Sequence, residues 1–144
     1  MIVFLDSCIF VYAAGIDHPY RKPCQEILIA EKKRKIFSYV DTEVLQEILY
    51  LGFYKKETDK SLLIVENVIE LLDEDSILPV SVKDISRASE LLNKYRSIEP
   101  RDAVHLAVMK NNNIDIICTA DRGIKAIKEI TVIDPIDLAE RLKK

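Results

Sequence analysis

Glycine is scarce in this sequence: only three glycines occur among its 144 residues. Phosphate-binding loops of the P-loop and dinucleotide-binding kinds need several glycines within one strand-to-helix turn, where the backbone wraps closely around a phosphate. The scarcity of glycine therefore excludes both kinds of nucleotide site. Any phosphate chemistry in this protein has to rest on side chains.

Cysteine and long apolar runs are scarce as well. The three cysteines, Cys8, Cys24 and Cys118, lie far apart and include no C-x-x-C pair, which argues against a zinc site or a disulfide framework and predicts a reduced, cytoplasmic protein. Cys8 and Cys118 stand in apolar runs and are expected to pack as core residues. No run reaches the roughly 18 apolar residues of a membrane span, and no basic segment precedes Ile2, so we expect neither a membrane helix nor a signal peptide.

Positive charge is not in excess. The 21 basic and 24 acidic residues give a net charge of −3, whereas a strongly basic balance is typical of proteins that bind nucleic acid by bulk electrostatics. An enzyme that holds phosphates through metal ions remains compatible with this balance. Such a site needs clustered carboxylates, which cancel basic residues placed elsewhere.

Short apolar runs alternate with longer amphipathic segments of helical period. We predict strands at 2–5, 36–40, 77–80, 114–118 and 130–133, and helices at 23–33, 42–56, 60–75, 82–96 and 100–111, with further helices after Asp6 and Asp134. This alternation favours an α/β fold: a three-layer sandwich with a central, mainly parallel sheet of about five strands flanked by helices. The length favours one domain spanning residues 1–144.

Two aspartates directly follow predicted strands. Asp6 ends the run IVFLD, and Asp121 stands in ICTADRG after the fourth strand. An aspartate in this position either caps the next helix or lies where open α/β sheets bind their ligands. Asp102 lies in the first turn of a helix that is apolar on nearly every side, and this places Asp102 beside the core.

Glu43 and Glu47 share one face of the predicted 42–56 helix, because they are four residues apart. We favour Glu47 as a site residue, since it lies between Leu45 and Ile48 in an apolar stretch. Glu43, in the first turn, has a ready interpretation as a partner of the helix dipole.

Asp6, Glu47, Asp102 and Asp121 are all expected at the carboxyl edge of the sheet. Carboxylates that converge in this way repel one another, and without a counter-charge at least one pKa rises sharply. Hard divalent cations such as Mg²⁺ and Mn²⁺ prefer oxygen ligands and relieve this repulsion. The four residues therefore predict a divalent metal site.

The same residues carry a resemblance to the PIN-domain ribonuclease family. Four segments match the motifs of that family in order: FLDSCIFVY through Asp6 and Ser7, LQEILY through Glu47, RDAVHLAV through Asp102, and CTADRGI through Thr119 and Asp121. In size and motif order the chain is similar to the single-domain VapC-type toxins of prokaryotic toxin–antitoxin pairs. One position departs from the pattern, because Cys8 stands where the family often has an asparagine that helps to order the loop around the first aspartate.

The resemblance implies metal-dependent hydrolysis of RNA, with one or two Mg²⁺ or Mn²⁺ ions held by Asp6, Asp102 and Asp121, and by Glu47 directly or through water. It also implies a cognate antitoxin, and we expect a homodimer. The helix pair at about 42–73 would offer a groove to the antitoxin or a face to a second copy, although such apolar residues more often serve the core. An RNA-processing nuclease outside any toxin pair and a non-catalytic interaction module remain alternatives.

The neighbouring polar residues have two interpretations each. Ser7 and Thr119 would hydrogen-bond a ligating carboxylate or the phosphate, or act as ordinary caps. Arg101 and Arg122 would contact substrate phosphates or offset the carboxylates. His105 is expected to pack in the core with a hydrogen bond rather than to act as a general base.

Overall fold

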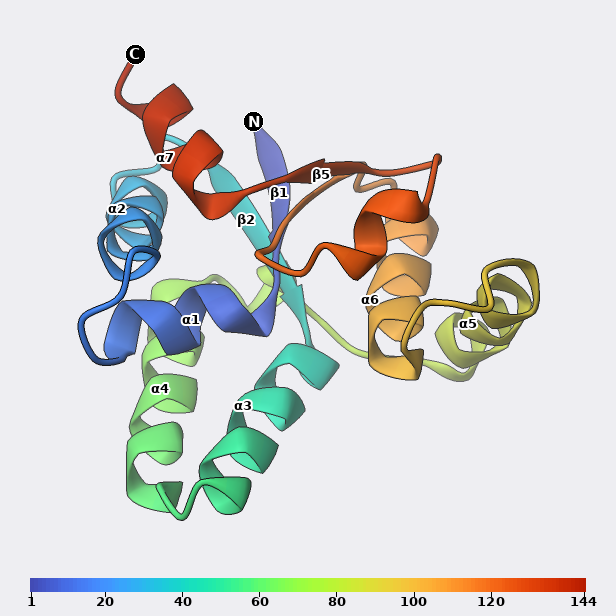
Figure 1. Cartoon of the computed structure of the whole chain (residues 1–144), viewed down its shortest axis with the longest axis horizontal. Coiled ribbons are helices and arrows are strands. Elements are labelled where there is room, and N and C mark those ends of the chain that lie inside the picture. Colours follow the sequence, from blue (N-terminus) through green and yellow to red (C-terminus); the bar gives the residue numbers. More distant parts are fainter.

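Five parallel strands form the centre of the molecule (Figure 1). The computed structural model describes residues 1–124 and 127–144, and only the backbone of residues 125–126. The strands are β1 (Ile2–Leu5), β2 (Phe37–Asp41), β3 (Ile77–Leu78), β4 (Ile116–Cys118) and β5 (Thr131–Ile133), in the spatial order β3-β2-β1-β4-β5. Each neighbouring pair runs parallel. The predicted fold class is therefore confirmed.

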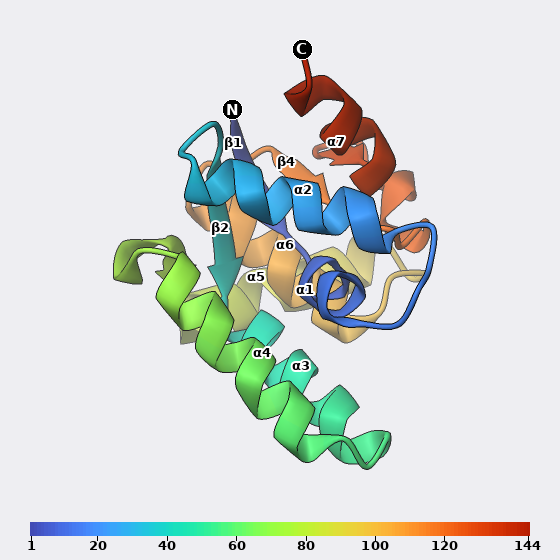
Figure 2. The same cartoon turned by 90° about the vertical axis from the view of Figure 1, so that its left-hand side faces the viewer.

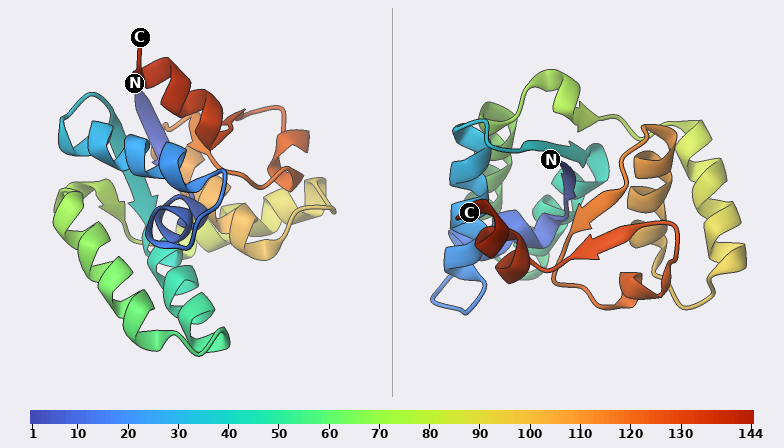
Figure 3. Two further views of the ribbon diagram at one scale, coloured as in Figure 1. Left: turned by 60° about the vertical axis from the view of Figure 1, so that its left-hand side comes forward. Right: turned by 90° about the horizontal axis from the view of Figure 1, so that it is seen from above.

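Helices cover both sides of the sheet (Figures 1 and 3). They are α1 (Ser7–Ala14), α2 (Arg21–Lys32), α3 (Thr42–Tyr54), α4 (Thr58–Leu71), α5 (Val82–Lys94), α6 (Pro100–Asn111) and α7 (Pro135–Leu142), with short 3₁₀ helices η1 (Glu74–Ser76) and η2 (Gly123–Ala126). Helices α1, α2 and α7 lie on one side, and α5 and α6 lie on the other. Figure 2 shows α3 and α4 side by side as an antiparallel hairpin that extends beyond the sheet. Among the described residues, no helix combines the length and the apolar character that crossing a bilayer requires.

The element boundaries follow from local chemistry. β3 is shorter than predicted, because Pro79 has no N–H with which to continue the sheet ladder. The 60–75 helix ends early, at Leu71, and η1 follows it. Pro100 and Pro135 each occupy the first turn of a helix, where the N–H that proline lacks would have no helical partner.

The centre of the sheet explains the unbroken apolar run at the start of the chain. Val3, Phe4 and Leu5 are fully buried, because β1 lies between β2 and β4 and is covered by helices on both faces. The carboxyl ends of β1, β2 and β4 reach the same edge of the sheet. Helices α1 and α3 begin directly at this edge, so it gathers residues from distant parts of the sequence.

Candidate active site

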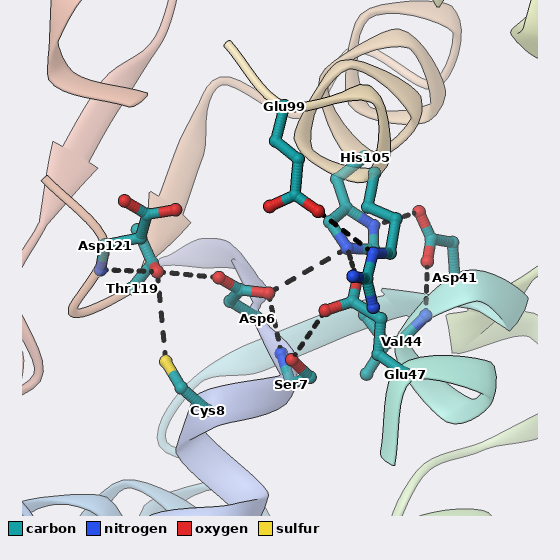
Figure 4. Close-up of polar contacts among 11 residues, drawn as sticks. Asp6, Ser7, Cys8, Asp41, Val44, Glu47, Glu99, His105, Thr119 and Asp121 are labelled. Atoms are coloured by element: carbon teal, nitrogen blue, oxygen red, sulfur yellow. Dashed lines mark hydrogen bonds and ion pairs between the residues drawn. The ribbon is translucent and has the colours of Figure 1, made fainter. Parts of the chain in front are cut away.

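Asp6 lies at the end of β1 and is buried. Its Oδ1 accepts a hydrogen bond from the Ser7 backbone N–H (2.8 Å), and its Oδ2 accepts one from the Thr119 hydroxyl (2.7 Å; Figure 4). Burial raises the pKa of Asp6, while His105 and Thr119 counteract part of that rise. Asp6 therefore caps α1 with one oxygen and meets the β4–η2 connection with the other.

Glu47 reaches the same place from the second turn of α3. The Ser7 hydroxyl donates to its Oε2 (3.0 Å), and its Oε1 contacts Nε2 of His105 (Figure 4). Burial acts to raise the pKa of Glu47, but the hydrogen bonds from His105 and Ser7 outweigh it, so that this pKa lies below its ordinary value. Glu43 lies close enough for Glu47 to contribute to its raised pKa, after burial, yet Glu47 makes the contacts with Ser7 and His105.

His105 is fully buried and faces three carboxylates. Its Nδ1 lies 2.7 Å from Asp41 Oδ2, and its Nε2 contacts Glu47 and lies 3.8 Å from Asp6 Oδ1. Burial acts to lower the pKa of His105, but Asp41 and Glu47 raise it well above its ordinary value. His105 is therefore an imidazolium near neutral pH, with both ring nitrogens donating.

Asp41 is the residue that the sequence interpretation of this site lacked. Its Oδ1 accepts from the Val44 backbone N–H (2.9 Å), which is the helix cap that its position predicts. Its second oxygen holds His105. The sequence carried the signal, because Asp41 directly follows the predicted strand 36–40 just as Asp6 follows the predicted strand 2–5. In the structure Asp41 is the last residue of β2. The core hydrogen bond expected for His105 is present, but as part of an ionic network.

Asp102 and Asp121 are the other two acidic residues predicted at the carboxyl edge of the sheet. Asp102, in the first turn of α6, is 9% exposed. Its pKa is raised to about 8 by burial and by the neighbouring Asp121 and Asp6 carboxylates. Asp121 is exposed, with its backbone N–H donating to the Thr119 hydroxyl (3.0 Å) and its Oδ1 accepting from the Gly123 N–H (2.8 Å). Thr119 thus joins Asp6 to Asp121, which lies at the solvent-facing side of the cluster.

The donor set suits a hard divalent cation. Asp6, Glu47 and His105 each offer an atom within 4.8 Å of the other two, but the ring nitrogens of His105 are occupied by carboxylates, so its role is to hold them. The remaining donors are carboxylate oxygens of Asp6, Glu47, Asp102 and Asp121. The raised pKa of Asp102 shows that its charge is poorly compensated by the protein itself. A cation at this place would supply the missing compensation.

The two arginines flank this cluster differently. Arg101 Nε lies 3.1 Å from Glu99 Oε1. Burial acts to lower the Arg101 pKa, but the Glu99 carboxylate, followed by those of Glu47 and Glu43, raises it. Arg122 is exposed beside Asp121. Cys8 is half-buried, and its Sγ lies 3.8 Å from the Thr119 hydroxyl oxygen. Cys8 therefore contacts the Asp6 loop through Thr119, while Cys118 is a buried core residue as predicted.

Metal-free protein is expected to lose stability as the pH rises from about 4 to about 8. The folded-state pKa of Asp102, about 8, exceeds the ordinary value of 3.8, so between these values the folded state binds more protons than the unfolded state, and the free energy of unfolding falls with pH. Urea unfolding in EDTA across this range, followed by circular dichroism, measures the slope. Asp102→Asn should flatten it and exceed wild-type stability at pH 8 by roughly 1–3 kcal/mol. An unchanged slope in the variant would contradict this assignment.

The chain matches the family model of the PIN domain over residues 3–130. Among curated proteins, it is 30% identical over 122 residues to "Ribonuclease VapC13" of Mycobacterium tuberculosis, which covers 85% of this chain and 92% of the relative. It is also 30% identical over 126 residues to "Ribonuclease VapC23" of the same species, covering 85% and 95%.

Solved structures with the same fold include Mycobacterium tuberculosis VapC20, described as a sarcin-ricin loop cleaving toxin. The TM-score is 0.73 at 14% identity, with 89% of this chain and 96% of that chain covered. VapBC2 from Rickettsia felis, bound to a DNA fragment from its promoter, gives a TM-score of 0.71 at 17% identity and coverages of 93% and 98%. At these identities the likeness shows the fold alone.

Proposed function

The chain belongs to the PIN domain family, and we propose that it is a Mg²⁺- or Mn²⁺-dependent endoribonuclease that acts as the toxin of a toxin–antitoxin pair. The observation that carries the proposal is the convergence of acidic residues from separate segments on one edge of the sheet. Asp6 and Glu47 offer oxygens within 4.8 Å of each other and of His105, and Asp102 lies close enough to Asp6 and Asp121 for their carboxylates to raise its pKa. The curated relatives named VapC ribonucleases support the reaction class.

In this proposal Asp6, Asp102 and Asp121 hold the metal, and Glu47 does so directly or through water. A bound Mg²⁺ or Mn²⁺ would lower the pKa of an attacking water and neutralise charge that develops on the phosphate. The protein contributes orientation. Thr119 holds Asp6, Ser7 holds Glu47, and the His105 imidazolium lies between the two carboxylates.

Arg101 is the cation placed to meet the substrate. Its side chain is 42% exposed and lies beside Asp102 in the first turn of α6. A planar guanidinium binds phosphate oxygens in bidentate fashion. We assign Arg101 to a phosphate next to the cleaved bond, and Arg122, which follows Asp121 in the sequence and is exposed, to another substrate phosphate.

We also propose protein partners, namely a cognate antitoxin and a second copy of the chain in a cytoplasmic homodimer. The solved relatives include toxin–antitoxin complexes, such as one from Klebsiella pneumoniae. Helix α4 leaves large apolar side chains half-exposed, namely Leu62, Leu63 and Ile69, and such side chains commonly serve protein contacts. Light scattering of the purified protein should give the mass of a dimer. A monomer at micromolar concentration would contradict the proposed homodimer.

Cleavage of a mixed RNA pool is expected to need added metal. Protein incubated with Mg²⁺ or Mn²⁺ should cut the pool, EDTA should stop cutting, and re-addition of metal should restore it. Titration calorimetry on the same preparation should show Mn²⁺ binding to the carboxylates, at one or two ions per chain. Cutting that persists in EDTA would contradict the metal site. A folded protein that cuts no RNA with any metal would favour the interaction module.

A further inference from the structure

A pocket of about 450 Å³ lies between the end of α2, the start of β2 and the end of α4 (Figure 2). This volume is in the range of sites that bind small molecules. The pocket lies at the amino end of β2, whereas Asp41, at the carboxyl end of the same strand, belongs to the network of the candidate active site. None of the four predicted metal ligands lines the pocket, so it is a separate feature of the molecule.

The wall of this pocket contains a buried hydroxyl group without a partner. Ser38 lines the pocket and is 1% exposed. Its Oγ forms no hydrogen bond within the part of the chain that the structure describes. Buried polar side chains in proteins nearly always have a hydrogen-bond partner, and leaving one unpaired is costly. A molecule bound in the pocket would supply the partner that the Ser38 hydroxyl lacks.

Carboxylates surround the same hydroxyl group. Glu31 is half-buried, and its Oε2 accepts a hydrogen bond from the Ser38 backbone N–H (2.9 Å), which places this carboxylate beside Ser38. Glu70, from α4, also lines the pocket. Neither glutamate forms an ion pair with any described residue. The pocket therefore contains two carboxylates that could accept a ligand cation.

The basic residues of the pocket are directed to solvent. Lys32 is exposed, and Arg34 lies 3.9 Å from the third acidic residue, Asp73, in a pair whose side chains are 72% and 73% exposed. Ion pairs this exposed contribute little, because water screens them. Lys32 and Arg34 therefore leave the charge of the more buried Glu31 uncompensated.

The rest of the wall is apolar. Ile36, Phe37 and Leu71 line the pocket, and Phe37 is 56% exposed although it is a large aromatic residue. Apolar side chains pack well against methylene groups, and the face of an aromatic ring attracts an ammonium group. A ligand that matches this wall combines positive charge with an aliphatic chain.

We propose that this pocket binds an aliphatic polyamine. A primary ammonium group has three N–H donors, which suit the Ser38 hydroxyl and the Glu31 carboxylate. The methylene chain then packs against Ile36, Phe37 and Leu71, and a second ammonium group pairs with Glu70. An anionic ligand would instead meet the Glu31 and Glu70 charges. This site is independent of the proposed ribonuclease function, because it uses neither the metal nor the RNA.

The test is titration calorimetry of the full chain with spermidine, in EDTA at an ionic strength of about 0.15 M. Wild type should bind one spermidine per chain. Ser38→Ala and Glu31→Gln should each bind it roughly 10- to 100-fold more weakly, the loss expected for one hydrogen bond to a charged group. Glutamine keeps an oxygen for the Ser38 N–H, so Glu31→Gln removes the charge and preserves that hydrogen bond.

Glu66 provides a matched control. It is an exposed glutamate on α4, as Glu70 is, but it does not line the pocket. Glu66→Gln should bind spermidine within about twofold of wild type, because exposed charges are largely screened at this ionic strength. Without ligand, Ser38→Ala should be at least as stable as wild type in urea unfolding, since it removes an unpaired buried hydroxyl. Weaker binding by this variant is then not a consequence of unfolding.

Three results would overturn the proposal. If wild type binds no spermidine, the pocket is not a polyamine site. If Glu66→Gln weakens binding as much as Glu31→Gln does, spermidine responds only to the overall negative charge. If Asp121→Asn weakens binding and Ser38→Ala does not, spermidine binds at the carboxylate cluster of the candidate active site instead.

Discussion

Asp102→Asn is expected to reduce metal-dependent RNA cleavage by more than about a hundredfold while the protein stays folded. Changes to residues that merely orient metal ligands already cost about 10- to 100-fold, and Asp102 is assigned here as a ligand. The variant keeps the shape of the side chain and removes the charge that Asp6 and Asp121 disfavour. Gel-based cleavage rates in saturating Mn²⁺, with wild type and variant purified in parallel, measure the loss.

The chain contains its own control for Asp102. Helices α6 and α7 both begin with proline, and Asp102 and Asp137 stand at the same position two residues later. Each has the same favourable interaction with the helix dipole, but Asp137 is exposed and lies outside the cluster. Asp137→Asn should therefore leave cleavage within about twofold of wild type, by the small effect typical of surface positions. If Asp102→Asn and wild type cleave equally well, Asp102 is not a metal ligand and only interacts with the helix dipole.

The fold was predictable because its signals are local. Apolar runs bounded by polar residues indicate buried parallel strands, and Pro100 or Asp134 indicates where a helix starts. The acids at strand ends were predictable for the same reason, since parallel strands bring their carboxyl ends to one edge. Asp6 and Asp121 needed only this rule.

The network around His105 depends on spatial order instead. Asp41 and His105 are 64 residues apart and meet because β2 lies next to β1 while α6 packs behind them. The hydrophobic periodicity of a segment does not predict which strands will be neighbours in the sheet. The same holds for Arg101 and Tyr50, which belong to α6 and α3 and meet only once those helices lie side by side. A sequence rule that treats every acid after a strand as a site candidate would have found Asp41, but not its partner.

His105→Leu is expected to destabilise the metal-free protein by about 3–5 kcal/mol, the cost of removing one partner from a buried ion pair. Leucine fills similar space but leaves the buried Asp41 carboxylate and the neighbouring Glu47 and Asp6 without their cation. Urea unfolding in EDTA at pH 6 measures the change. His18→Leu, at the only other histidine of the chain, removes an exposed hydrogen bond from the Tyr20 N–H and should cost no more than about 1.5 kcal/mol.

The pH dependence separates a charged His105 from one that merely fills space. Because the folded pKa of His105 is raised well above 6.5, its stabilisation is fully present below pH 6.5 and is lost progressively as the pH rises from 6.5 through the folded pKa. The stability difference between wild type and His105→Leu should therefore be constant from pH 5.5 to 6.5 and shrink in alkaline solution. Asp41→Asn should lower the free energy of unfolding less in the His105→Leu variant than in wild type, because in that variant the Asp41 charge is buried without a partner. The contrary result would be a small stability difference between wild type and His105→Leu that does not change with pH, together with additive effects of His105→Leu and Asp41→Asn. It would mean that His105 is neutral and that no cation lies between Asp6 and Glu47.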